Sequence, residues 1–162
     1  MAARRAGPKT VSPDREYELL IGRPQACPAR LRRGALRAFA RRLSDHVAGG
    51  RRFQCLLTGD RELRRLNRQF LGHDYPTDVL SFPEPSPDGF LGELAISVDR
   101  AAAQARAYGH TLLDEIRILM LHGVLHLLGM DHETDGGRMA RAETRWRRKL
   151  DLPAGLIERV RP

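Results

Sequence analysis

The strongest constraint in this chain is the segment from His122 to His132, which carries three of its six histidines. The first two histidines are four residues apart, so on a helix both rings project from one face. Gly129 then allows the backbone to leave the helix, because glycine accepts the left-handed conformation common at helix ends. The chain beyond it can bring His132 back toward the first two rings. Three imidazoles that leave a fourth position to water are typical of a catalytic zinc site.

An isolated histidine on an apolar helix face is usually a hydrogen-bonded core residue. Three of them at ligand spacing, followed by a helix breaker, favour metal binding instead. We therefore predict one Zn²⁺ per chain and assign catalysis, through a metal-bound water, to its three ligands, His122, His126 and His132. Asp131 directly precedes the third ligand, where it could orient an imidazole by accepting its second N–H. The alternative role for Asp131 is to cap a turn.

A zinc protease is the obvious competing hypothesis, because metzincin proteases share this histidine spacing. Their pattern places Glu directly after the first histidine, where it acts as general base toward the metal-bound water. Here that position is Gly123, which has no side chain to accept a proton. We therefore predict that this site performs different chemistry from a metzincin protease. A metal-dependent hydrolase of another substrate, including a peptide, stays open as an alternative.

The length of 162 residues and a hydrophobic content of 41% suit one domain with a real core. Residues 1–14, rich in Arg, Ala and Pro, are predicted to be a disordered leader, and residues 15–160 a single metallohydrolase domain. The longest apolar stretch, Ile118 to Met130, is too short and too polar to cross a membrane. No secretory signal is evident, and Cys27 and Cys55 lack ligand-like spacing. We therefore expect free thiols and a cytoplasmic location.

The net charge of +8 makes a polyanion a candidate partner, and nucleic acid is the commonest polyanion for a basic domain. Nearly all of the positive charge is arginine, which GC-rich coding alone also explains. Two arginine rows at helical spacing are therefore either solvated helix faces or an RNA track. These rows are Arg33, Arg37 and Arg41, and Arg141, Arg145 and Arg148.

The hydrophobic periodicity favours an α+β fold (α/β layered), with a small sheet of about four strands covered by about five helices. Strands are expected at residues 16–21, 53–57, 78–82 and 91–98. Helices are expected at residues 29–48, 61–70, 99–108 and 141–150, together with a long helix that opens at Thr111 and carries His122 and His126. Asp99 is the expected N-cap of its helix. The metal cleft is expected at the histidine-bearing helix.

Three separated blocks together resemble the YbeY endoribonuclease family, the bacterial rRNA maturation factors. The first block, from His122 to His132, meets every fixed position of a signature similar to His-Gly-x-Leu-His-Leu-x-Gly-x-Asp-His. The second is Pro-Thr-Asp-Val-Leu-Ser-Phe-Pro at residues 76–83, and the third is Leu-Gly-Glu-Leu-Ala-Ile-Ser at residues 91–97. The resemblance extends from about residue 16 to residue 150.

This resemblance implies a mixed sheet with helices and a cleft in which the three histidines hold zinc. It implies single-strand-specific, metal-dependent cleavage of RNA, in maturation of the 3′ end of 16S rRNA and in ribosome quality control. The implied partners are single-stranded RNA, rRNA and the small ribosomal subunit. Attack by a metal-bound hydroxide and attack by a 2′-hydroxyl that it deprotonates both stay open. A further alternative is a non-catalytic, ribosome-associated factor with a structural zinc.

One departure from the family concerns the substrate contacts, because many members carry Arg where this chain has Leu71. His73, or a nearby arginine, is a candidate for the phosphate contact in its place. Thr77 and Asp78 are further candidates for substrate binding. They either pin the loop beside the metal or only form a turn after Pro76.

Overall fold

The computed structural model of the chain describes residues 18–21 and 31–157. The predicted leader, residues 1–14, lies outside the described residues, and so do Cys27 and both ends of the predicted domain. Within the described part, helices cover a small mixed sheet, which confirms the predicted α+β fold. No helix there is long and apolar enough to pass through a lipid bilayer.

The sheet has four strands in the order β1-β2-β4-β3. The first three in this order run parallel to one another, and β3 pairs with β4 in the antiparallel direction. The β3–β4 pair forms a hairpin, in which Val79 pairs with Ile96 and Pro83 pairs with Gly92. The strands are β1 (Glu18–Ile21), β2 (Arg52–Thr58), β3 (Val79–Pro83) and β4 (Phe90–Ser97).

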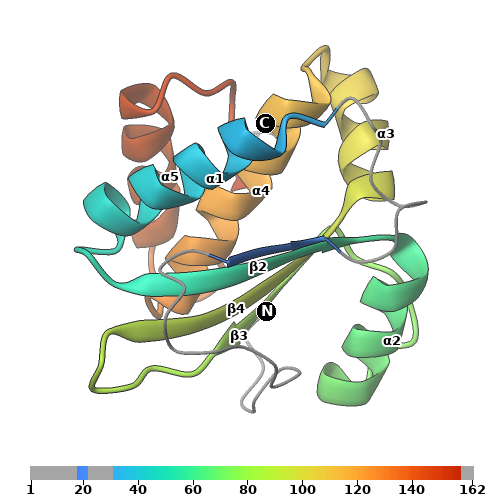
Figure 1. Ribbon diagram of the computed structural model, residues 1–162, viewed down its shortest axis with the longest axis horizontal. Helices are drawn as coiled ribbons and strands as arrows, with labels where there is room; N and C mark the ends of the chain where they lie inside the picture. Colours follow the sequence, from blue (N-terminus) through green and yellow to red (C-terminus); the bar gives the residue numbers. More distant parts are fainter. Residues whose placement is uncertain (1–17, 22–30, 158–162) are drawn as a thin grey trace.

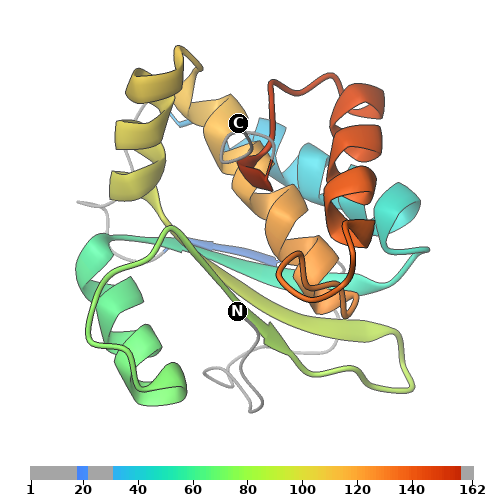
Figure 2. The ribbon, with the colours of Figure 1, turned by 180° about the vertical axis from the view of Figure 1, so that it is seen from behind.

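The helices divide between the two faces of the sheet. Figures 1 and 2 show α1, α3, α4 and α5 on one face and α2 on the other. The predicted helix at residues 29–48 begins at Arg33 within the described chain and widens into a π-helical turn, η1 (Leu43–Val47). The α-helices are α1 (Arg33–Arg42), α2 (Asp60–Leu71), α3 (Val98–Tyr108), α4 (Leu112–Leu127) and α5 (Arg138–Lys149).

Each face of the sheet has its own apolar core. On the α4 side, Leu94 and Ile96 of β4 join the apolar faces of α1, α4 and α5 in the larger cluster. On the α2 side, Leu63 and Leu66 pack over Leu80 of β3 and its neighbours. This alternation follows from the two-residue period of a strand, which sends successive side chains to opposite faces.

Helix α4 is the central element of the larger layer. Every residue from Ile118 to Leu127 is buried, as expected for a helix that is apolar on nearly all sides. The helix opens at Thr111 as predicted, and the Thr111 hydroxyl caps it by accepting the backbone N–H of Asp114 at 3.1 Å. The two histidines of α4 are therefore part of a rigid, fully packed element.

The predicted capping role of Asp99 is wrong. Helix α3 begins at Val98, directly after β4, so Ser97 occupies the N-cap position and its hydroxyl accepts the N–H of Arg100 at 3.1 Å. The Asp99 carboxylate instead accepts the backbone N–H of Asp60 at 2.9 Å, at the start of α2. The strand runs into the helix without a linking turn, and this shifts the cap two residues toward the N-terminus.

Cys55 lies inside the sheet layer and is a free thiol, as expected. Burial raises its pKa to about 12, because the apolar surroundings disfavour the thiolate. The thiol is therefore chemically inert at neutral pH.

Candidate metal centre

The C-terminal half of α4 supplies the first two histidines of the site. His122 and His126 lie one turn apart, and each is only 6% exposed. Their ring centroids are 4.8 Å apart, and the two Nε2 atoms face each other at 3.2 Å. This close pair of imidazoles is the geometry that the four-residue spacing predicts.

The end of α4 brings the third histidine to the same place. Gly129 has φ +87°, the left-handed conformation that favours glycine, and the chain turns back there. The ring centroid of His132 then lies 5.6 Å from that of His122 and 5.7 Å from that of His126. One ligand atom from each ring lies within 4.8 Å of the other two. The structure thus assembles the three histidines that the sequence singles out.

Two acceptors fix the orientation of the first two rings. Nδ1 of His122 lies 2.8 Å from the Glu143 carboxylate, which reaches in from α5. Nδ1 of His126 lies 2.9 Å from the carbonyl oxygen of Met130, in the segment after the helix. Both partners accept the hydrogen bond, so Nδ1 of each ring is the donor, and the tautomer with its proton there has its lone pair on Nε2.

These tautomers make the pair a fit for a metal ion. Two Nε2 lone pairs at 3.2 Å repel each other unless a cation lies between them. Tetrahedral coordination at about 2.0–2.1 Å from zinc places ligand nitrogens about 3.3 Å apart. The observed separation matches this value, so the positions of His122 and His126 suit zinc without rearrangement.

Two further observations support a metal site. Burial, followed by the nearby His122, lowers the pKa of His126 to about 3, so this ring is neutral and available as a ligand at physiological pH. Nδ1 of His132 is buried and finds no hydrogen-bond partner among the described residues. A buried polar atom without a partner costs free energy unless a bound group, such as a metal ion, satisfies it.

Asp131 takes the second of the two roles considered for it. Its carboxylate accepts the backbone N–H of Glu133 at 3.1 Å, and this contact is the largest cause that lowers its pKa. The side chain is exposed and caps the turn that carries His132. The acceptors that orient His122 and His126 are Glu143 and the Met130 carbonyl.

Glu143 is the functional residue that motif reasoning missed. It is 1% exposed, and its second oxygen accepts the backbone N–H of Ile157 at 3.0 Å, so both oxygens are engaged. A Cβ at Gly155 would lie 2.0 Å from that oxygen, so only glycine leaves room for the carboxylate there. One signal was available in the sequence. Glu143 falls four residues after Met139 and seven before Leu150, on the apolar face of a basic helix.

The predicted substrate residues lie outside the histidine cluster. The His73 ring packs beside the Tyr75 ring, with centroids 5.3 Å apart. Asp78 accepts the N–H of Val79 at 2.8 Å and the side-chain amide of Gln104 at 3.2 Å, while Thr77 donates to Asp78 at 3.4 Å. These contacts fasten the start of β3 to α3 and do not reach the imidazoles.

The residue that departs from the family pattern has an apolar role. Leu71 is the last residue of α2 and is partly buried against the smaller core. Its neighbour Phe70 packs edge-on against Phe82, with ring centroids 5.3 Å apart. Position 71 therefore packs against apolar side chains of the α2 layer.

Gly123 explains why this site differs from a zinc protease. A Cβ there would lie 2.7 Å from Cδ2 of Leu94 and 3.3 Å from Cγ2 of Val79, because α4 presses against the sheet at this point. The backbone carbonyl of Gly123 also accepts a hydrogen bond from Ser81 at 3.2 Å. A glutamate in this position would be forced between helix and sheet.

Gly123→Ala is expected to destabilise the fold. Overpacking of this contact costs about 1–3 kcal/mol, partly offset by the gain of about 0.5–1 kcal/mol that Ala brings to a helix interior. Urea denaturation measures the difference. Gly34→Ala in α1 is the matched control, because a Cβ there meets nothing within 4 Å. An unchanged or raised stability of Gly123→Ala would show that the helix does not need this close approach.

Comparisons with known proteins agree with this geometry. Residues 29–151 match the family described as Endoribonuclease YbeY. The chain is 66% identical over 133 residues to the Endoribonuclease YbeY of Solibacter usitatus, covering 82% of this chain and 89% of that relative. It is 51% identical over 107 residues to that of Nautilia profundicola, covering 65% of this chain and 77% of that relative.

A solved structure shares the fold. The solution structure of TM1509 from Thermotoga maritima superposes with a TM-score of 0.55 at 26% identity, covering 80% of this chain and 85% of that one. The family match includes the whole histidine cluster together with Glu143. The chain therefore belongs to the YbeY endoribonuclease family.

Proposed function

We propose that this chain is a metal-dependent endoribonuclease whose metal is one Zn²⁺ held by His122, His126 and His132. The observation that carries the proposal is the convergence of these three rings, with one ligand atom each within 4.8 Å, in a member of this family. Family membership supports RNA as the substrate. It also supports single-strand-specific cleavage in maturation of the 3′ end of 16S rRNA and in ribosome quality control.

The donor set favours a catalytic metal over a structural one. Among the described residues, the group that could hold an ion contains three ligands and no fourth His, Cys, Asp or Glu. Structural zinc sites are closed by four protein ligands, whereas catalytic sites keep one position open. A bound zinc ion supplies Lewis acidity toward a phosphate oxygen and brings the pKa of coordinated water close to neutrality.

The residues of the chain prepare this site in three ways. The Nε2 atoms of His122 and His126 face each other, because the Nδ1 protons of the two rings are held by Glu143 and the Met130 carbonyl. Burial of both rings keeps water away from these hydrogen bonds and preserves their orientation. The packed helix α4 holds the pair still, so little reorganisation accompanies metal binding or catalysis.

Peptide hydrolysis is the competing function. The contact of Gly123 with Leu94 leaves no room for the glutamate that zinc proteases use as general base.

We also propose a cytoplasmic location and association with the small ribosomal subunit, where this family's substrate is found.

An assay on two substrates tests the proposed function. Purified protein is expected to cleave single-stranded RNA and to leave casein intact. A chelator is expected to stop the cleavage, and added Zn²⁺ to restore it, because neutral imidazole ligands release their metal to a stronger competitor. Cleavage of RNA that survives removal of all metal would contradict the proposal, and cleavage of casein alone would favour the competing function.

A further inference from the structure

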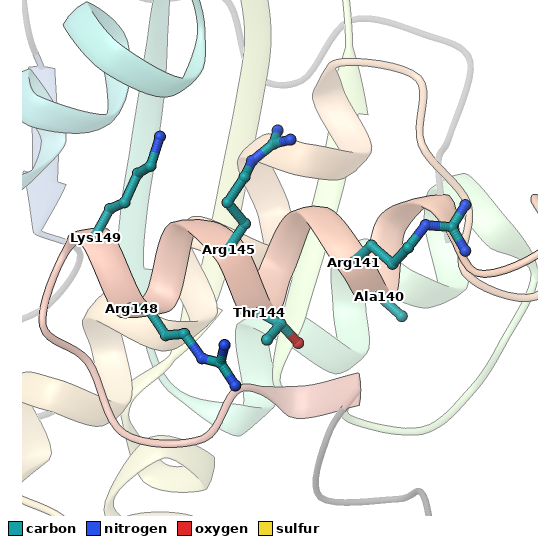
Figure 3. Close-up of a pocket in the computed structure, with 6 residues that line it drawn as sticks. All are labelled: Ala140, Arg141, Thr144, Arg145, Arg148 and Lys149. Carbon is teal, nitrogen blue, oxygen red and sulfur yellow. The ribbon is translucent and has the colours of Figure 1, made fainter.

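The outer face of α5 carries a dense group of positive charges that the metal centre does not use. Six of the twelve residues of α5 are arginine or lysine, and its one acid, Glu143, is buried against His122. Four of the cations are exposed and line one hollow of about 510 Å³ together with Ala140 and Thr144 (Figure 3). We call Arg141, Arg145, Arg148 and Lys149 the α5 patch.

In the described part of the chain, no ion pair includes any of the four cations of the α5 patch. Helix α2 is different, although it is also rich in arginine. There, Arg64 pairs with Asp74 at 2.9 Å and Arg65 pairs with Glu62 at 2.5 Å. Uncompensated like charges on one helix repel one another, so a polyanion that neutralises them is favoured at the α5 patch.

A partly buried tryptophan holds two of these cations in place. The Arg145 guanidinium lies 5.7 Å from the ring centroid of Trp146, and Lys149 Nζ lies 5.1 Å from it. Trp146 itself packs against the larger core. Figure 3 shows Arg145 and Lys149 pointing to one side of the helix and Arg148 to the other. The positive charges are therefore spread across the hollow, and the helix that carries them is anchored to the core through Trp146.

We propose that the α5 patch binds the phosphate backbone of the RNA substrate and holds it next to the metal centre. This inference rests on the proposed function. Arg141 to Lys149 extends along about 12 Å of helix axis, enough for more than one phosphate. Phosphate contacts of this kind position a nucleic acid without reading its sequence. The opposite face of the same helix carries Glu143, which contacts His122. Only about one helix diameter, roughly 10 Å, therefore separates the α5 patch from this contact.

The chemistry of the hollow favours RNA over an acidic protein. Protein interfaces depend on buried aromatic or aliphatic anchors at their centre. The hollow is lined by four cations, an alanine and a threonine. The large hydrophobic residues that are exposed in the described chain, Tyr75 and Tyr108, belong to other elements. A flexible chain of phosphates needs no apolar anchor.

The test compares two triple variants with the same spacing and the same change in charge. The patch variant carries Arg141→Gln, Arg145→Gln and Arg148→Gln. The matched control carries Arg61→Gln, Arg65→Gln and Arg68→Gln on α2, on the other face of the sheet. Both sets of arginines are exposed, and glutamine is a good helix former, so both variants are expected to fold. Affinity for an unstructured 2′-O-methyl RNA is measured against salt concentration with the metal-loaded proteins.

The RNA affinity of the patch variant is expected to depend less steeply on salt concentration than that of the wild type. Each phosphate neutralised on a single strand contributes roughly −0.7 to the slope of log K against log salt, so the loss of three contacts makes the slope less negative by about 2. Between 50 and 200 mM salt, the wild-type affinity should then fall about 20-fold more than that of the patch variant. On cleavable RNA, KM should rise while kcat and metal content stay unchanged. The α2 control should behave like the wild type.

Several outcomes would overturn the assignment. An unchanged slope in the patch variant, or an equal change in the α2 control, would show that the α5 patch is not the RNA contact. So would tighter binding of polyglutamate than of RNA, which would identify an acidic protein as the partner. If wild-type protein cleaves RNA in these cases, the proposed function stands without the patch. If it neither binds nor cleaves RNA, the proposed function fails as well.

Discussion

Replacing His126 with alanine is expected to abolish RNA cleavage and metal binding together. The variant removes one of three ligands, and with it the Nε2 atom that faces His122 at 3.2 Å. Metal catalysis is worth several kcal/mol of transition-state stabilisation, so we expect a loss of at least roughly a thousandfold in kcat/KM. Steady-state kinetics on single-stranded RNA and metal analysis of the same preparation measure both effects.

Two companion variants make this result specific. His122→Ala removes the other ligand of α4 and should give the same loss. His46→Ala changes an exposed histidine of η1 that belongs to no cluster of metal-ligating side chains among the described residues, and it should leave activity and metal content at the wild-type level. A folded His126→Ala protein that cleaves RNA at the normal rate would refute the assignment of the three ligands. A loss of activity in His46→Ala would show that the assay reports general damage.

Replacement of Glu143 is expected to have the second largest effect. Glu143→Ala leaves the Nδ1 proton of His122 and the N–H of Ile157 without acceptors, and each unpaired buried group costs about 1–3 kcal/mol. It also frees the His122 ring to rotate or to change tautomer. Loss of such an outer partner typically weakens metal affinity by about 10–100-fold. Competition with a fluorescent chelator measures the affinity, and urea denaturation measures the stability.

The conservative variant separates positioning from folding. Glu143→Gln keeps the volume but offers one acceptor oxygen for two donors, so either His122 or Ile157 faces an amide N–H instead. We expect an intermediate loss of metal affinity with nearly normal stability. Glu133→Ala is the control. It removes an exposed carboxylate next to His132 and should bind metal normally. Wild-type metal affinity in Glu143→Gln would show that the carboxylate only fills space.

The metal ligands were readable from the sequence because their spacing is local. His122 and His126 share one helix, and Gly129 returns the chain to His132 within a few residues. The strands and helices followed the apolar periodicity for the same reason. Each of these predictions depends on neighbours that are close in sequence.

The partners that orient the rings were not readable in the same way. Glu143 comes from a different helix, 21 residues after His122, and the packing of α5 on α4 decides that the two meet. The Met130 acceptor is a backbone carbonyl, which carries no sequence signal at all. Asp99 failed as a cap because β4 runs directly into α3, and that geometry depends on tertiary structure.

Anomalous diffraction at the zinc edge tests the central claim most directly. Crystals of protein purified without added metal are expected to show one peak per chain, coordinated by one nitrogen each from His122, His126 and His132. A water or another exogenous ligand should complete the shell, with Glu143 hydrogen-bonded behind His122. A fourth protein side chain on the metal, or three rings turned away from a common point in fully active protein, would contradict the account.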